Sequence, residues 1–237
     1  MVRALCAAQC NENAPFFPHT LFPHPPCPPC LGCKDFWDDW APLKAHLTVA
    51  EQFEAFFAAA DGNPAATYPD LDMLPIGDVM HQGVLRPSGF TPSEAQLLIT
   101  LWSFCGAPLI MGGDLPPSSP ATLALLTNER ILRVHGAARG RRVLHAAAAS
   151  GSSDIHAWGA APAEAPAEAY VALINAADGP AAQNVTLPLA SLPWLPAGSA
   201  VCAVDLWSGN AAGRFAAGAF HALIEPHAAG AFRLAAC

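Results

Sequence analysis

The spacing of apolar residues changes near residue 143 and divides the chain into two patterns. Before that point, short apolar runs alternate with segments in which apolar residues recur at helical spacing. After it, short runs of alternating apolar and polar residues are separated by Gly, Pro, Asp and Asn. These patterns predict an α/β part followed by an all-β part.

One helix is clearly marked within the α/β part. Thr91 is followed by Pro92 at the first helical position and by Glu94 three residues after the threonine, which is the pattern of a capping box. Gly106 ends the apolar segment that follows. The sequence therefore predicts a helix from about Pro92 to Phe104.

Two extended segments flank this helix. The run P-D-L-D-M-L covers residues 69–74, and L-I-M covers residues 109–111 directly before two glycines. The second run predicts a buried strand that ends in a loop. Asp70 and Asp72 would share one face of the first segment if it is extended. The order strand, loop, helix, strand, loop predicts a parallel α/β architecture, because parallel strands need a crossover connection.

Two more helices are predicted. The letters T-V-A-E at residues 48–51 form a second capping box and predict a helix over residues 48–60. Its aromatic residues recur at a spacing that predicts one buried face: Phe53, Phe56 and Phe57. Ser119-Pro120 predicts the start of another helix, which ends near Asn128.

The all-β part contains seven short runs at near-regular spacing, which predict an antiparallel β-sandwich. The runs are V-L-H-A, I-H-A-W, A-Y-V-A-L-I-N, N-V-T-L-P-L, V-C-A-V-D-L-W-S-G, A-F-H-A-L-I-E-P-H and A-F-R-L. The arginines within residues 139–142 predict a solvated linker in front of them. We therefore expect an irregular lead-in at residues 1–34, an α/β domain at residues 35–140 and a β-sandwich at residues 141–237.

The lead-in is rich in Pro and Cys and shows no periodicity. Cys27, Cys30 and Cys33 resemble a zinc knuckle, but the fourth ligand of such a site would have to come from a residue such as His19 or Cys10. A poorly ordered or disulfide-tied lead-in is the favoured interpretation. A mispredicted first exon would give the same abrupt change in composition.

Composition narrows the class of protein. Of the 237 residues, 53% are apolar and 13% are charged, which is typical of a globular chain. A net charge of -8 with 11 scattered Lys and Arg argues against nucleic acid as a partner.

The apolar run at residues 97–113 is interrupted by Gly106-Ala107-Pro108, so we expect no membrane helix. The first ten residues make a poor signal peptide, which predicts an intracellular protein or a true N-terminus elsewhere, and the eight cysteines leave the compartment open.

Several blocks of this chain resemble, in order and spacing, the last third of the catalytic barrel of the family 27 glycoside hydrolases, the α-galactosidases and α-N-acetylgalactosaminidases. The blocks are P-D-L-D-M-L-P-I-G, F-T-P-S-E-A-Q, L-W-S-F-C-G-A-P-L-I-M-G-G-D-L and S-S-P-A-T-L-A-L-L-T-N-E. V-D-L-W-S-G and I-E-P-H-A-A-G-A-F-R-L resemble the family's C-terminal domain. The resemblance implies a fold: the last strands and helices of a (β/α)8 TIM barrel, then an antiparallel β-sandwich.

The resemblance also implies a chemistry, the retaining hydrolysis of terminal α-D-galactosyl residues, which uses two carboxyl groups and water and no cofactor or metal. Asp35, in D-F-W-D-D-W, stands at the position of the family's general acid/base. Leu31 stands where the family has an arginine that would hold sugar hydroxyls. By the same resemblance, Asp70, Asp72 and Met73 line or support the sugar pocket, and the partner is an α-galactoside, with a homodimer left open.

Other polar residues have structural interpretations. Asp38 and Asp39 are expected to cap a helix, Asp70 could accept backbone amides in a turn, and Asp114 is expected to be a turn residue. Three histidines of the all-β part are expected to be surface or core residues rather than ligands: His156, His221 and His227. Asn184-Val185-Thr186 is a glycosylation sequon that matters if the chain is secreted.

The predicted barrel is incomplete. A whole (β/α)8 barrel takes about 250 residues, whereas about 140 precede the sandwich. Glu12 is the one carboxylate before Asp35, and its context is not strand-like. We therefore expect an α-galactosidase-like sequence without its nucleophile half. The alternatives are a non-catalytic carbohydrate-binding or interaction module and a non-functional gene fragment.

Overall fold

The computed structural model describes residues 36–52, 54, 70–165 and 167–237. Residues 36–237 form one compact unit, separate from residues 1–35. Asp35 and the cysteines of the lead-in lie outside the described residues, as does most of the helix predicted over residues 48–60.

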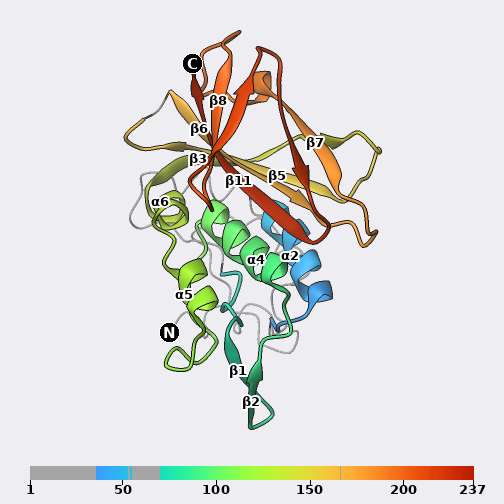
Figure 1. Ribbon diagram of the computed structural model, residues 1–237, viewed down its shortest axis with the longest axis vertical. Coiled ribbons are helices and arrows are strands. Elements are labelled where there is room, and N and C mark those ends of the chain that lie inside the picture. Colours follow the sequence, from blue (N-terminus) through green and yellow to red (C-terminus); the bar gives the residue numbers. More distant parts are fainter. Residues whose placement is uncertain (1–35, 53, 55–69, 166) are drawn as a thin grey trace, which may run out of the picture. The chain divides into compact units, whose positions relative to one another are not determined.

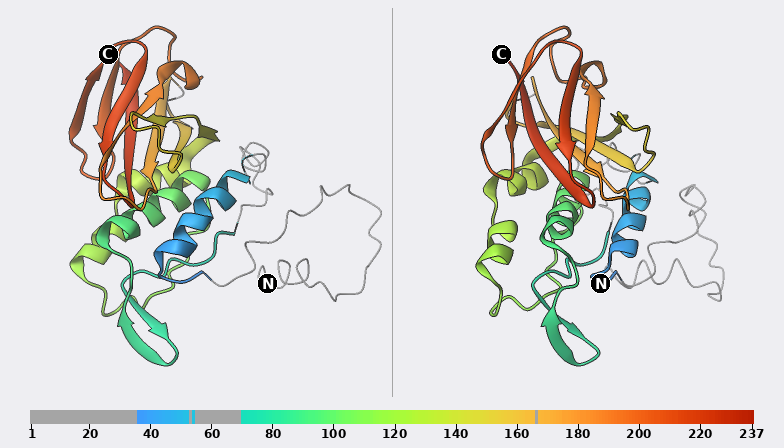
Figure 2. Two further views of the ribbon diagram at one scale, coloured as in Figure 1. Left: turned by 90° about the vertical axis from the view of Figure 1, so that its right-hand side faces the viewer. Right: turned by 45° about the vertical axis from the view of Figure 1, so that its right-hand side comes forward.

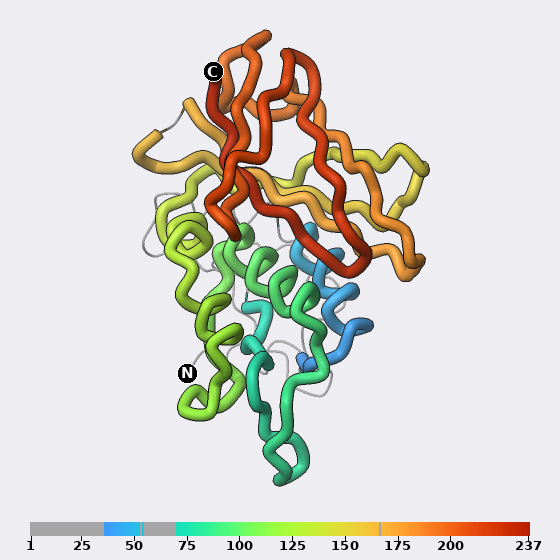
Figure 3. Tube along the Cα trace, in the orientation of Figure 1, coloured from blue at the N-terminus to red at the C-terminus, as the bar shows by residue number. Residues whose placement is uncertain are grey.

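In the part of the chain that the structure describes, four helices and a hairpin come first (Figure 1). The helices are α2 (Trp40–Gln52), α4 (Pro92–Cys105), α5 (Pro120–Leu126) and α6 (Glu129–Ala137). The hairpin joins β1 (Asp78–His81) to β2 (Val84–Pro87) through Gln82 and Gly83, which both have positive φ, as a two-residue hairpin turn requires. Figure 3 traces the hairpin as a loop that projects away from the helices.

The prediction for α4 is confirmed. Thr91 accepts a hydrogen bond from the Glu94 backbone, Glu94 accepts one from the Thr91 backbone, and Gly106 caps the other end with φ 70°. The helix predicted from Ser119 is confirmed as α5.

The predicted start of a helix at Thr48 is wrong, because Thr48 lies inside α2. Leu43, Leu47 and Ala50 follow one another at helical spacing and are fully buried. The buried face of α2 therefore continues across residues 48–51, where the sequence predicted a helix start. Pro42 lies in the first turn, where a missing N–H costs little.

The predicted linker is also wrong. Residues 129–137 form α6, and Arg139, Arg141 and Arg142 belong to strand β3 (Ala138–Leu144). Arg141 is buried, and its guanidinium donates hydrogen bonds to the carbonyl oxygens of Val134, His135 and Ala138. A cation bonded to the last carbonyls of a helix stabilises that end, so this arginine terminates α6 instead of being solvated.

The antiparallel β-sandwich is confirmed. One sheet has six strands in the order β3-β5-β6-β11-β8-β9, and the other has three in the order β10-β7-β4, all antiparallel. The remaining strands are β4 (Ala147–Ala148), β5 (Ile155–Pro162), β6 (Glu168–Asn175), β7 (Gln183–Pro188), β8 (Val201–Asp205), β9 (Ala211–Phe215), β10 (Ala219–Ile224) and β11 (Ala228–Ala236), with a short 3-10 helix, η2 (Leu189–Ser191), after β7. The seven predicted runs overlap seven of these strands, and β4 and β9 were not predicted.

The six-stranded sheet is covered on both faces. Along β6, Tyr170, Ala172 and Ile174 belong to one buried cluster with α4, whereas Val171 and Leu173 belong to a second cluster with the three-stranded sheet. Figure 2 shows the helices below one sheet and the second sheet beyond it. The order of layers is therefore helices, six-stranded sheet, three-stranded sheet.

The parallel strands predicted for the α/β part are represented, in the described residues, by one isolated parallel bridge. Leu74 and Met111 form a parallel bridge, in which the Leu74 amide donates to Ile110 O (2.7 Å) and the Gly112 amide donates to Leu74 O (2.9 Å). Ile110 is exposed, Leu109 and Met111 are half-buried, and the run forms an isolated bridge rather than a strand, so the prediction of a buried strand over residues 109–111 is wrong. The partial barrel remains a prediction.

Candidate functional site

The loop at residues 70–74 was predicted to line a sugar pocket, and its centre is Asp72. The carboxylate of Asp72 accepts hydrogen bonds from the backbone amides of Phe36 (2.9 Å) and Met73 (2.7 Å). Its carbonyl oxygen accepts a hydrogen bond from the indole of Trp102 in α4 (3.0 Å). The loop is thus fastened both to α4 and to the residue that follows Asp35 in the sequence.

Asp70 and Asp72 do not share the face of an extended strand. Asp72 has φ 72°, in the left-handed region, so the segment turns at this residue. Asp70 accepts a hydrogen bond from the Asp72 amide (2.9 Å), which confirms the turn expected for Asp70. Asp70 is exposed, whereas Asp72 is half-buried, so the two carboxylates have different surroundings.

Met73 packs against the next loop. A Cβ atom at Gly112 would lie 2.5 Å from Met73 Sδ, so the absence of a side chain at Gly112 leaves the space that Met73 occupies. The Asp114 amide donates to Asp78 O (2.7 Å) in an isolated antiparallel bridge, so Asp114 pairs with the start of the hairpin, and the turn expected at this residue lies at residues 116–117 instead.

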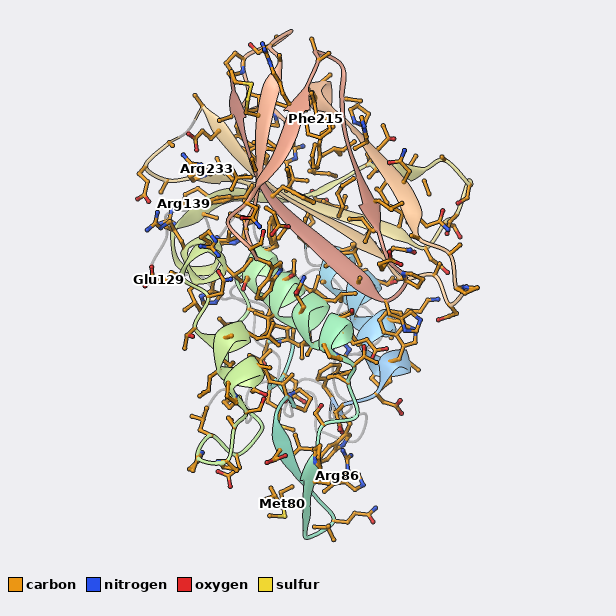
Figure 4. All side chains as sticks on the ribbon, viewed as in Figure 1. Met80, Arg86, Glu129, Arg139, Phe215 and Arg233 are labelled. Atoms are coloured by element: carbon orange, nitrogen blue, oxygen red, sulfur yellow. A yellow bond between two sulfur atoms is a disulfide. The ribbon has the colours of Figure 1, made fainter. Side chains whose placement is uncertain are left out.

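Asp38 is not a helix cap, which corrects the prediction. Its side chain is 3% exposed and binds the guanidinium of Arg86 on β2 through both oxygens, at 2.5 and 3.0 Å. It also accepts a hydrogen bond from the Gly89 amide (2.5 Å). Figure 4 marks Arg86 on the hairpin. Asp38 therefore fastens the hairpin to the segment that precedes α2, while Asp39 is exposed directly before the helix.

A polar network that was not predicted joins α2 to the loops of the sandwich. Asp178 accepts hydrogen bonds from Lys44 Nζ (2.8 Å) and from the indole of Trp40 (2.7 Å), and these bonds, chiefly the one from Lys44, lower its pKa to about 2. His227 Nε2 lies 3.3 Å from Asp178, and the His227 ring stacks on Trp40 at 3.7 Å. No local pattern indicates this network, because Trp40 and Lys44 lie 138 and 134 positions away from Asp178.

Three histidines of the all-β part are paired with carboxylates or rings. His227 Nδ1 lies 2.9 Å from Glu94 Oε1, His156 Nδ1 lies 2.6 Å from Glu51 Oε1, and His221 meets the Phe215 ring edge-on. Among the described residues, no group of three or more His, Cys, Asp or Glu is placed to hold a metal ion. None of the described helices is both long and apolar enough to cross a bilayer.

A shallow hollow lies on the sandwich. It is an open groove of about 690 Å³ between β9 and β10, with Phe215, Phe220 and Phe232 among the residues that line it. Asn184, Arg214 and His221 supply polar atoms to its wall.

Comparisons with known proteins agree on one group of enzymes. Residues 153–234 match the model of the alpha galactosidase C-terminal beta sandwich domain. The chain is 27% identical over 197 residues to alpha-galactosidase 2 of Arabidopsis thaliana, a match that covers 82% of this chain and 43% of that relative.

Solved structures give a similar result. The crystal structure of a GH27 β-L-arabinopyranosidase from Geobacillus stearothermophilus matches with a TM-score of 0.72 and 27% identity, over 85% of this chain and 43% of that one. Alpha-galactosidase I of Mortierella vinacea matches with a TM-score of 0.57 and 20% identity, over 72% of this chain and 40% of that one, and this likeness concerns the fold alone. The chain spans less than half the length of each of these relatives.

Proposed function

We propose that this chain, which is similar to the C-terminal region of the family 27 glycoside hydrolases, is part of a retaining glycosidase that removes terminal α-D-galactosyl residues. The similarity to α-galactosidase 2 and to the β-L-arabinopyranosidase extends over 82% and 85% of the chain, well beyond the sandwich match. The relatives are about twice as long, and we place the nucleophile in the part of them that this chain does not match.

The observation that carries the proposal is the hydrogen bond from the Phe36 amide to Asp72 (2.9 Å). It ties the residue next to Asp35 to the loop that the resemblance assigns to the sugar pocket. In the proposed mechanism, Asp35 protonates the leaving oxygen and then takes a proton from the attacking water.

The loop residues have different tasks in this proposal. The Asp72 carboxylate already accepts hydrogen bonds from two backbone amides, so Asp72 positions the loop and does not bind the sugar. Asp70 is exposed and accepts hydrogen bonds from sugar hydroxyls. Met73, packed against Gly112, supports the loop from the side of the parallel bridge.

The test compares two proteins on nitrophenyl α-D-galactopyranoside: the 237-residue chain, and the same chain extended by its upstream coding sequence. We expect turnover by the extended protein alone, and we expect Asp35→Asn to lower its kcat by about 100-fold or more. Asp39→Asn is the matched control, because Asp39 is exposed and close in sequence. Robust turnover by the 237-residue chain would contradict the proposal that it lacks a nucleophile.

Nitrophenyl β-L-arabinopyranoside belongs in the same assay. This sugar has the ring of α-D-galactose without its exocyclic carbon, and a missing carbon group changes discrimination by about 10- to 200-fold. A higher kcat/KM on the arabinopyranoside would contradict the galactosyl specificity and leave the reaction class intact.

A further inference from the structure

The sequon Asn184-Val185-Thr186 lies on β7 with its two functional residues on the outer face. Val185 is buried between the sheets, whereas Asn184 is exposed and Thr186 is half-exposed. Residues two apart on a strand point the same way, so the asparagine and the threonine hydroxyl are presented together. A glycosylation acceptor has to be accessible at the surface, and Asn184 meets that condition although it lies on a strand rather than in a loop.

The neighbouring strand presents an uncovered apolar side chain to Asn184. Leu223 on β10 is the direct partner of Asn184 in the register, and it is 68% exposed, more than any other large apolar residue in the described part of the chain. An isolated leucine on a surface is common, but this one adjoins a groove.

The groove between β9 and β10 has Asn184 and Leu223 in its lining. Phe215 offers an apolar ring, and Asp205 and Arg214 bring opposite charges to the same wall. Such a mixture favours a neutral ligand with apolar C–H faces and many hydroxyl groups over an anion or a cation. Figure 4 marks Phe215 in this region of the sandwich.

A disulfide supplies an independent indication of the compartment. Cys202 on β8 is bonded to Cys237, just beyond β11, with the two Cα atoms 5.6 Å apart. Disulfides persist in oxidising compartments such as the endoplasmic reticulum and the extracellular space. Asparagine-linked glycosylation is a property of proteins that pass through the same compartments.

We propose that Asn184 carries an N-linked glycan whose first sugars lie over Leu223 and fill the groove between β9 and β10. The amide nitrogen of Asn184 forms a bond to C1 of the first sugar, while the bond from C1 to a lipid-linked diphosphate breaks. The diphosphate leaves with the electron pair, and the amide gives up one proton. The C–H faces of the sugars cover Leu223 and Phe215, and their hydroxyls meet Asp205 and Arg214.

The first experiment is mass spectrometry of the protein from its natural source. We expect the peptide that contains Asn184 to lose the mass of a glycan after peptide-N-glycosidase treatment, with conversion of the asparagine to aspartate. An unmodified Asn184 in that protein would overturn the proposal. The result does not depend on hydrolase activity, so it is distinguishable from a failure of the proposed function.

Variants of the full chain, secreted from a eukaryotic host, test the acceptor. Asn184→Gln and Thr186→Val are expected to abolish the glycan, and Thr186→Ser, which preserves the sequon, is expected to retain it. Retention of the glycan in Thr186→Val would overturn the assignment to Asn184.

Hydroxyl-radical footprinting tests where the glycan lies. Removal of the glycan is expected to increase oxidation of Leu223 several-fold and to leave Leu85, an exposed leucine of the hairpin, unchanged. Equal oxidation of Leu223 before and after removal would overturn the placement. Protection of Leu223 by free galactosides at least as strong as by the glycan would do the same, because the groove would then belong to a free sugar.

Discussion

At the scale of single residues, Asp38 shows how surroundings decide the role of an acid. Burial alone would raise its pKa, but hydrogen bonds from Arg86 and Gly89 outweigh this effect, and the pKa is lowered. In D-F-W-D-D-W the sequence offers two adjacent acids without showing which one is buried. The partners of Asp38 lie 48 and 51 positions away, so its role could not be predicted locally.

We predict that Asp38→Asn lowers the free energy of unfolding by about 2 kcal/mol, because it removes the charge from a buried, fully hydrogen-bonded carboxylate. Since the folded-state pKa is below the ordinary value of 3.8, this stabilisation is present above pH 3.8 and is lost as the pH falls toward the folded-state pKa. Urea denaturation of both proteins at neutral and acidic pH measures the difference.

Asp39→Asn is the control for this prediction. Asp39 is exposed, and an unfolding free energy within about 0.5 kcal/mol of the unmodified chain is expected. Equal losses from the two substitutions would contradict the role given to Asp38.

At the scale of elements, local signals predicted some helices and failed for others. The signal for α4 is complete within the helix and its caps, so sequence was sufficient. Arg141 belongs to the strand that follows α6, and its side chain binds the last carbonyl oxygens of that helix. In the sequence, the run of arginines around Arg141 has the pattern of a linker. The start of α2 was not predicted, because T-V-A-E has the pattern of a capping box although it lies in the middle of this helix.

We predict that Thr91→Ala lowers the free energy of unfolding by about 1 kcal/mol through loss of the α4 cap. Ser119→Ala removes the corresponding cap of α5, a helix with no buried residues, and is expected to cost less. Both values come from equilibrium denaturation followed by circular dichroism. A larger loss at Ser119 than at Thr91 would show that burial of the helix does not govern the cost.

At the scale of the whole molecule, the six-stranded sheet belongs to two hydrophobic clusters. The sandwich was predictable from alternation, but the second buried face was not, because its partner residues in α4 lie far away in sequence. The residues proposed for catalysis were predicted only through the resemblance to the family. Asp35 lies outside the described residues, and no local sequence pattern indicates the left-handed turn at Asp72.

A truncated chain that starts at residue 138, the first residue of β3, tests this layering. It would expose the side chains that now face α4, among them Trp158, Tyr170 and Ile174. We predict that it aggregates or binds a hydrophobic dye, whereas a chain that starts at residue 36 does not. A soluble, dye-negative product with native β-sheet circular dichroism would contradict this prediction.

The disulfide permits a test by a double-mutant cycle. A crosslink that spans 35 positions stabilises a folded chain by about 3 to 4 kcal/mol in the loop-entropy model. We predict that Cys202→Ser, Cys237→Ser and the double variant all lose the same free energy of unfolding. Additive losses would show that the two cysteines act separately.

The two oxygens of Glu94 serve different parts of the molecule. One holds Thr91 at the start of α4, and the other lies 2.9 Å from His227 in the turn between β10 and β11. Fraying of the first turn of that helix therefore withdraws a partner from the sandwich at the same moment. In a calorimeter, the helical layer and the sandwich should melt as one cooperative event, with equal van't Hoff and calorimetric enthalpies.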